Sequence, residues 1–110
     1  MAKRSDKSSR IIKRFLDKAS EQITIDKVIL FGSFARRKQK KWSDIDLAII
    51  SDDFKEINNF ERLVMLGKIA WYAKVTEIEA LGYTKDEYKN ATKLDFLGEI
   101  KRTGKVIYSK

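Results

Sequence analysis

Two stretches of sequence, VILFGS at 28–33 and DIDLAII at 44–50, carry the most information in this chain, and ten residues separate the Gly-Ser pair from the first aspartate. The apolar run that ends at Gly32 is typical of a buried strand followed by a turn whose backbone N–H groups can bind a phosphate. The second run alternates, so Asp44 and Asp46 project from one face of a strand. Carboxylates arranged in this way hold divalent cations. The pattern therefore predicts a site for a metal-bound triphosphate.

The residue types that are missing narrow the possible chemistry. The chain of 110 residues has no Cys and no His. This composition excludes disulfides, zinc sites with the usual ligands, and nucleophilic mechanisms that need a thiolate or an imidazole. A bound metal must have oxygen ligands, which favours Mg²⁺, with Mn²⁺ as the alternative. Proton transfer must fall to a carboxylate, Lys, Tyr or water.

The charge of the chain is unevenly distributed. The formal net charge is +8, and residues 36–41 include five basic side chains in six positions. This excess indicates an anionic partner, such as nucleotide phosphate, RNA or an acidic protein surface, or alternatively a Lys-rich solvated surface. No apolar run is long enough to span a bilayer, and no signal-peptide segment follows the basic N-terminus. We therefore expect a cytoplasmic protein.

The periodicity predicts a basic flexible tail over residues 1–8 and a single domain over 9–110. Helices are expected from Ser9, from Asn58 or Asn59, and from the capping box at Thr84 through Ile100. In the second helix, apolar residues at helical spacing are Phe60, Leu63, Val64, Gly67, Ala70 and Trp71. Strands are expected at about 26–31, 44–50, 75–81 and 106–108. This order predicts an α/β (α+β) domain with a small mixed β-sheet and helices packed on it.

A third carboxylate from a neighbouring strand would complete the metal site. Glu77 and Glu79 both project from one face of the expected strand 75–81, so their spacing does not choose between them. Arg36 lies one helical turn beyond Ser33 and can neutralise a triphosphate. The two aspartates, Gly32 and Arg36 also have ordinary structural interpretations. The aspartates can belong to a solvated edge strand, Gly32 to a turn and Arg36 to a solvated surface.

The two stretches resemble the signature of the minimal nucleotidyltransferases (the MNT family) of the DNA polymerase β superfamily. The resemblance rests on GSFAR at 32–36, on SDIDL at 43–47 and on the ten-residue spacing between them. The segment 78–88 is similar to the third strand and following helix of that family, and 104–108 resembles its usual ending. The resemblance covers about residues 20–108.

The resemblance implies a polymerase-β-like nucleotidyltransferase fold and assigns roles to individual residues. Gly32 and Ser33 would bind the nucleotide phosphates, with Arg36 and Arg37 beside them. Asp44 and Asp46 would bind Mg²⁺. Glu79 matches the third acidic position best, with Glu77 as the fallback, and would help to deprotonate the acceptor hydroxyl. The chain departs from the family in three places: Phe34 replaces a frequent Arg, Arg37 a frequent Gly, and Glu79 the usual Asp.

Standalone members of the family resemble the antitoxin half of HEPN–MNT toxin–antitoxin pairs. This resemblance implies transfer of AMP from ATP to a hydroxyl, the expected acceptor being a tyrosine of a helical HEPN partner. The alternative is a non-catalytic antitoxin that neutralises such a partner by association. A small RNA-binding protein ranks last, because it does not explain the paired aspartates.

Overall fold

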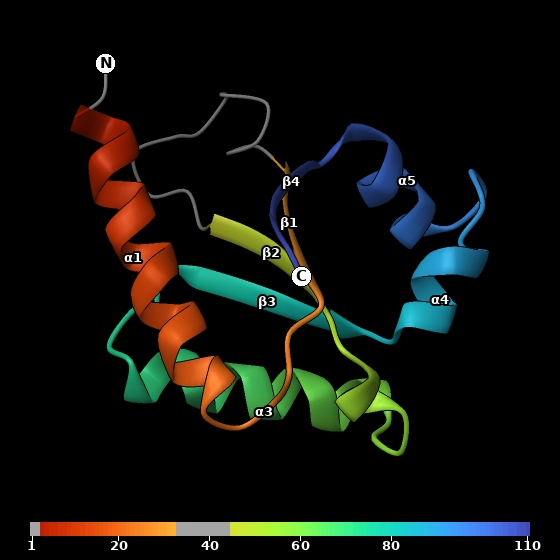
Figure 1. Cartoon of the computed structure of the whole chain (residues 1–110), viewed down its shortest axis with the longest axis horizontal. Coiled ribbons are helices and arrows are strands. Elements are labelled where there is room, and N and C mark those ends of the chain that lie inside the picture. Colours follow the sequence, from red (N-terminus) through yellow and green to blue (C-terminus); the bar gives the residue numbers. More distant parts are fainter. Residues whose placement is uncertain (1–2, 33–44) are drawn as a thin grey trace.

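The computed structural model describes residues 3–32 and 45–110, which form a four-stranded sheet with helices on both faces (Figure 1). The elements in chain order are α1 (Lys3–Ser20), β1 (Lys27–Phe31), β2 (Ile45–Ile50), the short 3-10 helix η1 (Asp52–Phe54), α3 (Asn59–Tyr72), β3 (Ile78–Tyr83), α4 (Lys85–Asn90), α5 (Phe96–Thr103) and β4 (Lys105–Ser109). None of the described helices is long and apolar enough to cross a membrane.

The sheet is mixed, as the sequence predicts. Its strand order is β3-β2-β1-β4. β1 is antiparallel to both of its neighbours, whereas β2 and β3 are parallel. A parallel pair requires a crossover connection, and η1 and α3 provide it. The end of β1 and the starts of β2 and β3 therefore lie at the same edge of the sheet.

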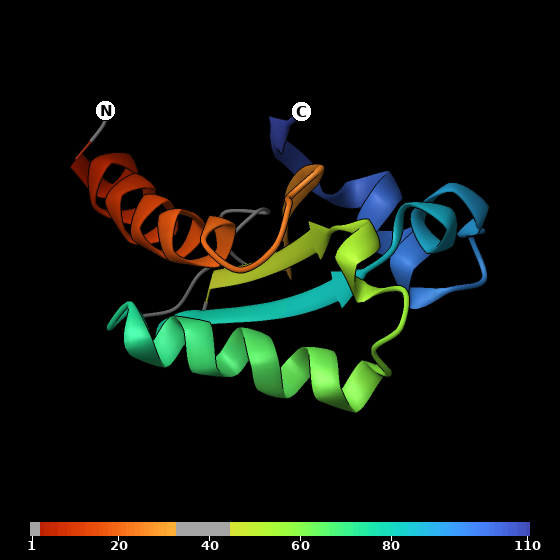
Figure 2. The same ribbon diagram turned by 60° about the horizontal axis from the view of Figure 1, so that its bottom comes forward.

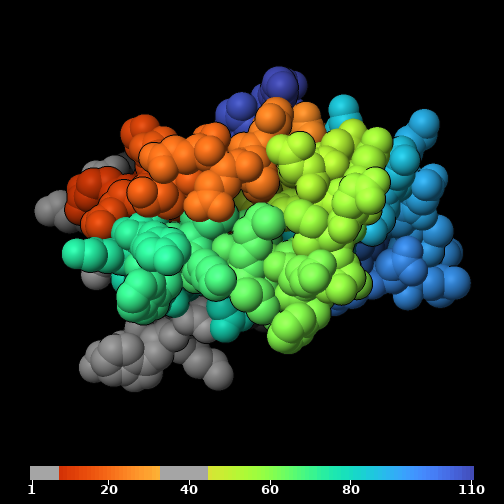
Figure 3. Space-filling model, turned by 90° about the horizontal axis from the view of Figure 1, so that it is seen from below, coloured from red at the N-terminus to blue at the C-terminus, as the bar shows by residue number. Residues whose placement is uncertain are grey.

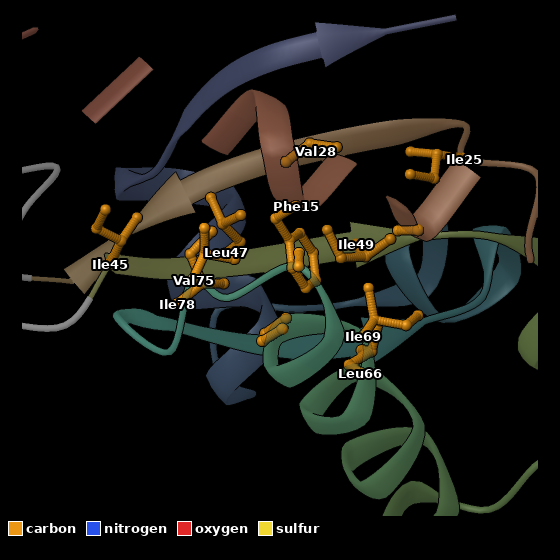
Figure 4. Close-up of a cluster of buried hydrophobic side chains, with 14 of the residues drawn as sticks. Phe15, Ile25, Val28, Ile45, Leu47, Ile49, Leu66, Ile69, Val75 and Ile78 are labelled. Carbon is orange, nitrogen blue, oxygen red and sulfur yellow. The ribbon is translucent and has the colours of Figure 1, made fainter. Parts of the chain in front are cut away.

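One face of the sheet carries the larger core. α1 and α3 lie side by side across it (Figure 3), and alternate β2 residues point toward them. Phe15, Leu47 and Ile49 are completely buried in this cluster (Figure 4). Close packing of this kind makes the cluster the main source of stability. The opposite face has a smaller core, built from Ile29, Ala48, Ile50, Leu97 and Ile100.

A buried arginine joins α3 to the far end of β3. The guanidinium of Arg62 donates hydrogen bonds to the backbone carbonyls of Ile57, Phe54 and Gly82 at 2.7, 2.8 and 3.2 Å, and to the Glu87 carboxylate at 2.8 Å. Only 6% of the Arg62 side chain is exposed. The planar fork of arginine suits this set of acceptors, so the residue fixes which side of α3 faces the sheet.

Three boundaries differ from the sequence predictions. α1 begins at Lys3, so residues 3–8 are helical and not a tail. The third strand begins at Ile78 and not at Val75, because residues 76–77 form a turn. Val75 precedes this turn and belongs to the larger core, so it does not share a face with Glu79. The helix predicted from Thr84 to Ile100 is two helices, α4 and α5.

The break between α4 and α5 has a local cause. The Asp95 carboxylate accepts a hydrogen bond from the Thr92 N–H at 3.0 Å, and the Thr92 hydroxyl accepts one from the Leu94 N–H at 3.2 Å. Such short side-chain bonds compete with the helical ladder. The capping box predicted at Thr84, by contrast, is present, and Asn58, one of the two predicted starts of the second helix, also forms a capping box.

Candidate functional site

Three residues form a row across the sheet at the edge where β1 ends and β2 and β3 begin. Phe31 on β1 is the antiparallel register partner of Asp46 on β2, and Asp46 is the parallel register partner of Glu79 on β3. Side chains that are directly opposite each other share a face of the sheet. The structure therefore brings Asp46 and Glu79 side by side on neighbouring strands.

The row lies on the face opposite the larger core. Ile45 and Leu47, which flank Asp46, are buried in that core, and Ile78 and Ala80 flank Glu79 in the same way. The apolar neighbours fix the register, because a slip of one residue would turn the carboxylates inward. Asp46 is half-buried and Glu79 is exposed. The strand register thus fixes the backbone positions of the two acidic residues, and of the two side chains that of Glu79 is the more exposed.

Gly32 follows β1 and lies against Asp46. Its φ of +78° falls in the left-handed region that side chains rarely adopt. A Cβ atom at this position would collide with the Asp46 Oδ2 atom and would lie 3.2 Å from its Cγ. Both the positive φ and the close approach to Asp46 therefore require glycine at position 32. Through this glycine, the segment that follows β1 contacts the Asp46 carboxylate.

Glu77, the alternative third carboxylate, occupies a different setting. It is exposed and lies in the turn before β3, outside the strand. Its backbone carbonyl accepts a hydrogen bond from the Ile45 N–H at 2.7 Å, which starts the parallel pairing. The position in register with Asp46 belongs to Glu79.

The remaining predicted site residues lie outside the described residues. They are Ser33, Arg36, Arg37 and Asp44. Within 3–32 and 45–110, no three acidic side chains come close enough to hold a metal ion. The described pair, Asp46 and Glu79, offers only carboxylate oxygens, which suit a hard cation such as Mg²⁺.

The sequence does not predict the aromatic pair that lies beside the carboxylates. The rings of Phe31 and Phe96 meet edge to face, with centroids 5.9 Å apart and an interplanar angle of 81°. Phe96 is 60% exposed, although it starts α5. The position of Phe31 next to Gly32 is a sequence signal, but only the tertiary structure brings Phe96 to it. The site therefore has an apolar flank next to its acidic row.

Tyr83 lies on the same face as Glu79, further along β3. Burial raises its pKa, and the nearby Glu87 carboxylate raises it further, while Arg62 acts in the opposite direction. The phenol consequently stays protonated at neutral pH. It belongs to the periphery of the smaller core and is no candidate for a proton acceptor.

The comparison with known families agrees with this architecture. The family model described as polymerase beta, nucleotidyltransferase matches residues 11–110. The chain belongs to this family. No curated protein matches the chain.

Two solved structures have the same fold as this nucleotidyltransferase domain. A candidate nucleotidyltransferase from Sulfolobus solfataricus matches with a TM-score of 0.63 and 19% identity, over 92% of this chain and 79% of the other. A toxin–antitoxin solved with AMP-PNP matches with a TM-score of 0.63 and 19% identity, over 89% of this chain and 73% of the other. Both comparisons confirm the mixed sheet with packed helices as a polymerase-β-like nucleotidyltransferase fold.

Proposed function

We propose that this protein is a Mg²⁺-dependent nucleotidyltransferase that transfers AMP from ATP to a hydroxyl of a partner protein. The observation that carries the proposal is the row at the sheet edge, in which Asp46 and Glu79 lie side by side and Gly32 lies against Asp46. The family of the chain and the AMP-PNP in a toxin–antitoxin of the same fold support the choice of reaction and of nucleotide.

In this proposal the carboxylates of Asp44 and Asp46 hold the metal, and Glu79 is the third acidic ligand. When bound, Mg²⁺ neutralises charge on the phosphates and on the leaving pyrophosphate. The position of Glu79 beside Asp46 favours it over Glu77. Gly32, Ser33, Arg36 and Arg37 are assigned to the phosphates, since backbone N–H groups and guanidinium groups both bind phosphate oxygens.

The acceptor oxygen attacks the α-phosphorus of the nucleotide. A new O–P bond forms, the bond from the α-phosphorus to the bridging oxygen breaks, and pyrophosphate leaves. The proton of the acceptor hydroxyl passes to a carboxylate, for which Glu79 is the candidate because it is exposed at the open edge. Positioning and charge neutralisation supply most of the rate in reactions of this kind.

The acceptor is proposed to be a tyrosine on a helical, HEPN-type toxin partner. This assignment rests on the resemblance of the motifs to MNT antitoxins and on the toxin–antitoxin of the same fold. A non-catalytic antitoxin that acts by association is the second candidate, and the replacement of the usual Asp by Glu79 is the observation that favours it.

Incubation with radiolabelled ATP and Mg²⁺, with and without the product of the neighbouring gene, tests the proposal. Asp46→Asn should lower labelling by at least about 100-fold, while the thermal midpoint changes little because the side chain is not part of the larger core. Glu79→Gln and Glu77→Gln form a matched pair, and only the first should lower labelling strongly. Labelling that survives Asp46→Asn would refute the enzymatic assignment. A stable complex without labelling would support the non-catalytic antitoxin.

A further inference from the structure

α3 carries a second apolar face that points away from the core. Phe60, Leu63, Val64 and Trp71 are 72%, 50%, 40% and 68% exposed, and Gly67 lies exposed among them. We call these five residues the outer stripe. No described element covers α3 on the side away from the sheet (Figure 2). A continuous exposed apolar surface of this kind marks an interaction site.

The spacing of the outer stripe is that of a seam between two helices. Phe60, Val64, Gly67 and Trp71 alternate between steps of four and three residues, which is the spacing of the contact positions in paired helices. The stripe is about 17 Å long at 1.5 Å per residue. A Cβ atom added to Gly67 would meet nothing within 4 Å. The middle of the stripe is therefore a notch in which another helix can approach closely.

We propose that the outer stripe binds the same stripe of a second copy of this chain, with the two α3 helices antiparallel about a two-fold axis. In this arrangement Phe60 faces Trp71 of the second copy, and Val64 faces Gly67 of the second copy. Large side chains meet at both ends and a small residue lies at the centre. A two-fold interface must be self-complementary in this way, since each contact occurs twice.

The charges beside the stripe select the antiparallel direction. Glu61 and Lys68 are both exposed and lie two helical turns apart on the same side of the stripe. In the antiparallel pair Glu61 lies near Lys68 of the second copy, and Lys68 lies near its Glu61. A parallel pair places equal residue numbers at the same level, so it does not oppose these two charges. The pattern therefore provides two ion pairs for one orientation only.

A hollow at the C-terminal end of α3 gives a second form of complementarity. Its walls are formed by Trp71, Tyr72, Lys74 and Thr76. The Trp71 and Tyr72 rings meet edge to face, with centroids 5.5 Å apart. The two-fold axis brings Phe60 of the second copy to this end of the helix. The exposed Phe60 ring of each copy therefore lies opposite the aromatic hollow of the other copy.

The size of the stripe sets the expected strength of the dimer. Its exposed apolar surface is on the order of 500 Å² per copy, since large aromatic side chains have about 150–250 Å² each. A standard stable interface buries about 800 Å² per partner. We therefore expect a weak dimer whose population rises with protein concentration.

Sedimentation velocity of the purified full chain, from about 1 μM to about 1 mM, tests the proposal. The wild-type protein should sediment faster as concentration rises. Gly67→Glu should remain monomeric over the whole range, with an unchanged or higher thermal midpoint because the site is open. Gly67→Ala is the matched control, since a methyl group fits the notch, and it should still associate.

Charge exchange gives the decisive readout. Glu61→Lys and Lys68→Glu should each weaken self-association by about tenfold or less, and an equimolar mixture of the two variants should associate again. Only contacts between copies can produce this complementation. A wild-type protein that stays monomeric, or a mixture that fails to recover, would overturn the proposal. A monomer that binds another protein through these residues would overturn the choice of a second copy as occupant. Because the readout is sedimentation, its failure is distinct from a loss of nucleotidyl transfer.

Discussion

The two faces of the sheet differ in what they do for the molecule, and adjacent residues of β2 show the difference. Leu47 is completely buried against α1 and α3, whereas Asp46, one residue earlier, points to the other face and is only half-buried. The first face carries a large continuous core. The second has a small core under α5 and leaves the edge with the carboxylates open. A strand can thus anchor the fold and present polar groups at once, because its side chains alternate.

The largest expected effect concerns the face with the larger core. Phe15→Ala should lower the free energy of unfolding by about 3–5 kcal/mol, since it removes a fully buried ring and leaves a cavity. Phe96→Ala on the other face is the matched control, and its exposed ring should cost only about 1 kcal/mol. Urea denaturation of both variants measures the difference. Equal losses would contradict the assignment of stability to one face.

The next effect concerns the anchor of α3. Arg62→Met should cost about 3 kcal/mol, because it removes the guanidinium hydrogen bonds to three backbone carbonyls, two of them buried, and the ion pair with Glu87. Arg62→Lys keeps the charge but loses the planar fork, so we expect a smaller loss. Chemical denaturation measures both. A neutral Arg62→Met would show that the apolar contacts of α3 are sufficient to orient it.

A third test concerns the open edge. Gly32→Ala should cost about 1–2 kcal/mol, because φ is positive at this residue and the added methyl meets the Asp46 carboxylate. In an Asp46→Ala background the same change should cost less, since the collision is removed while the backbone strain remains. A double-mutant cycle followed by thermal unfolding isolates the contact. Additive losses would mean that Asp46 moves aside freely.

The smallest effect depends on pH. Partial burial opposes ionisation of Glu87, but hydrogen bonds from Arg62 and Thr84 outweigh it and lower the pKa of this carboxyl below 4.5. A lowered folded-state pKa stabilises the protein above the unfolded value of 4.5, and this contribution is lost as pH falls through the folded value. Because 44% of the side chain is exposed, the contribution should be below about 1 kcal/mol.

Glu87→Gln provides the control for this pH dependence. Glutamine can keep the capping box at Thr84, so the change removes the charge with little effect on geometry. Thermal midpoints measured between about pH 3 and pH 6 should fall more steeply on acidification in the wild type than in the variant. Parallel curves would assign the acid sensitivity to other carboxylates.

Much of this architecture follows from local patterns. The apolar run before Gly32 and the alternation around Asp46 both identify strands. A continuous apolar run is typical of a strand buried on both faces, and alternation of a strand buried on one face. Asn58 and Thr84 mark helix starts because their side chains satisfy the free N–H groups of the first turn. The periodicity does not predict the split between α4 and α5, because it continues across the short hydrogen bond between Thr92 and Asp95 that competes with the helix.

The candidate site was predicted in part. The spacing within β2 identifies Asp46, and the turn after β1 identifies Gly32. The choice between Glu77 and Glu79 could not be made, because both have the same parity in sequence; the turn at 76–77 and the parallel register place Glu79 beside Asp46. Phe96 has no sequence signal at all, since its contact with Phe31 joins elements far apart in the chain.

α3 shows most directly where local pattern ends and tertiary structure begins. Its sequence determines a capped helix of 14 residues with apolar side chains on more than one side. Of the residues that revealed its periodicity, Ala70 is buried, while Phe60, Val64 and Trp71 are exposed. Periodicity is identical for every stripe along a helix, so it cannot say which one faces inward. Arg62, bound to carbonyls near η1 and at the end of β3, orients the helix, and long-range contacts alone decide which apolar surface is left for a partner.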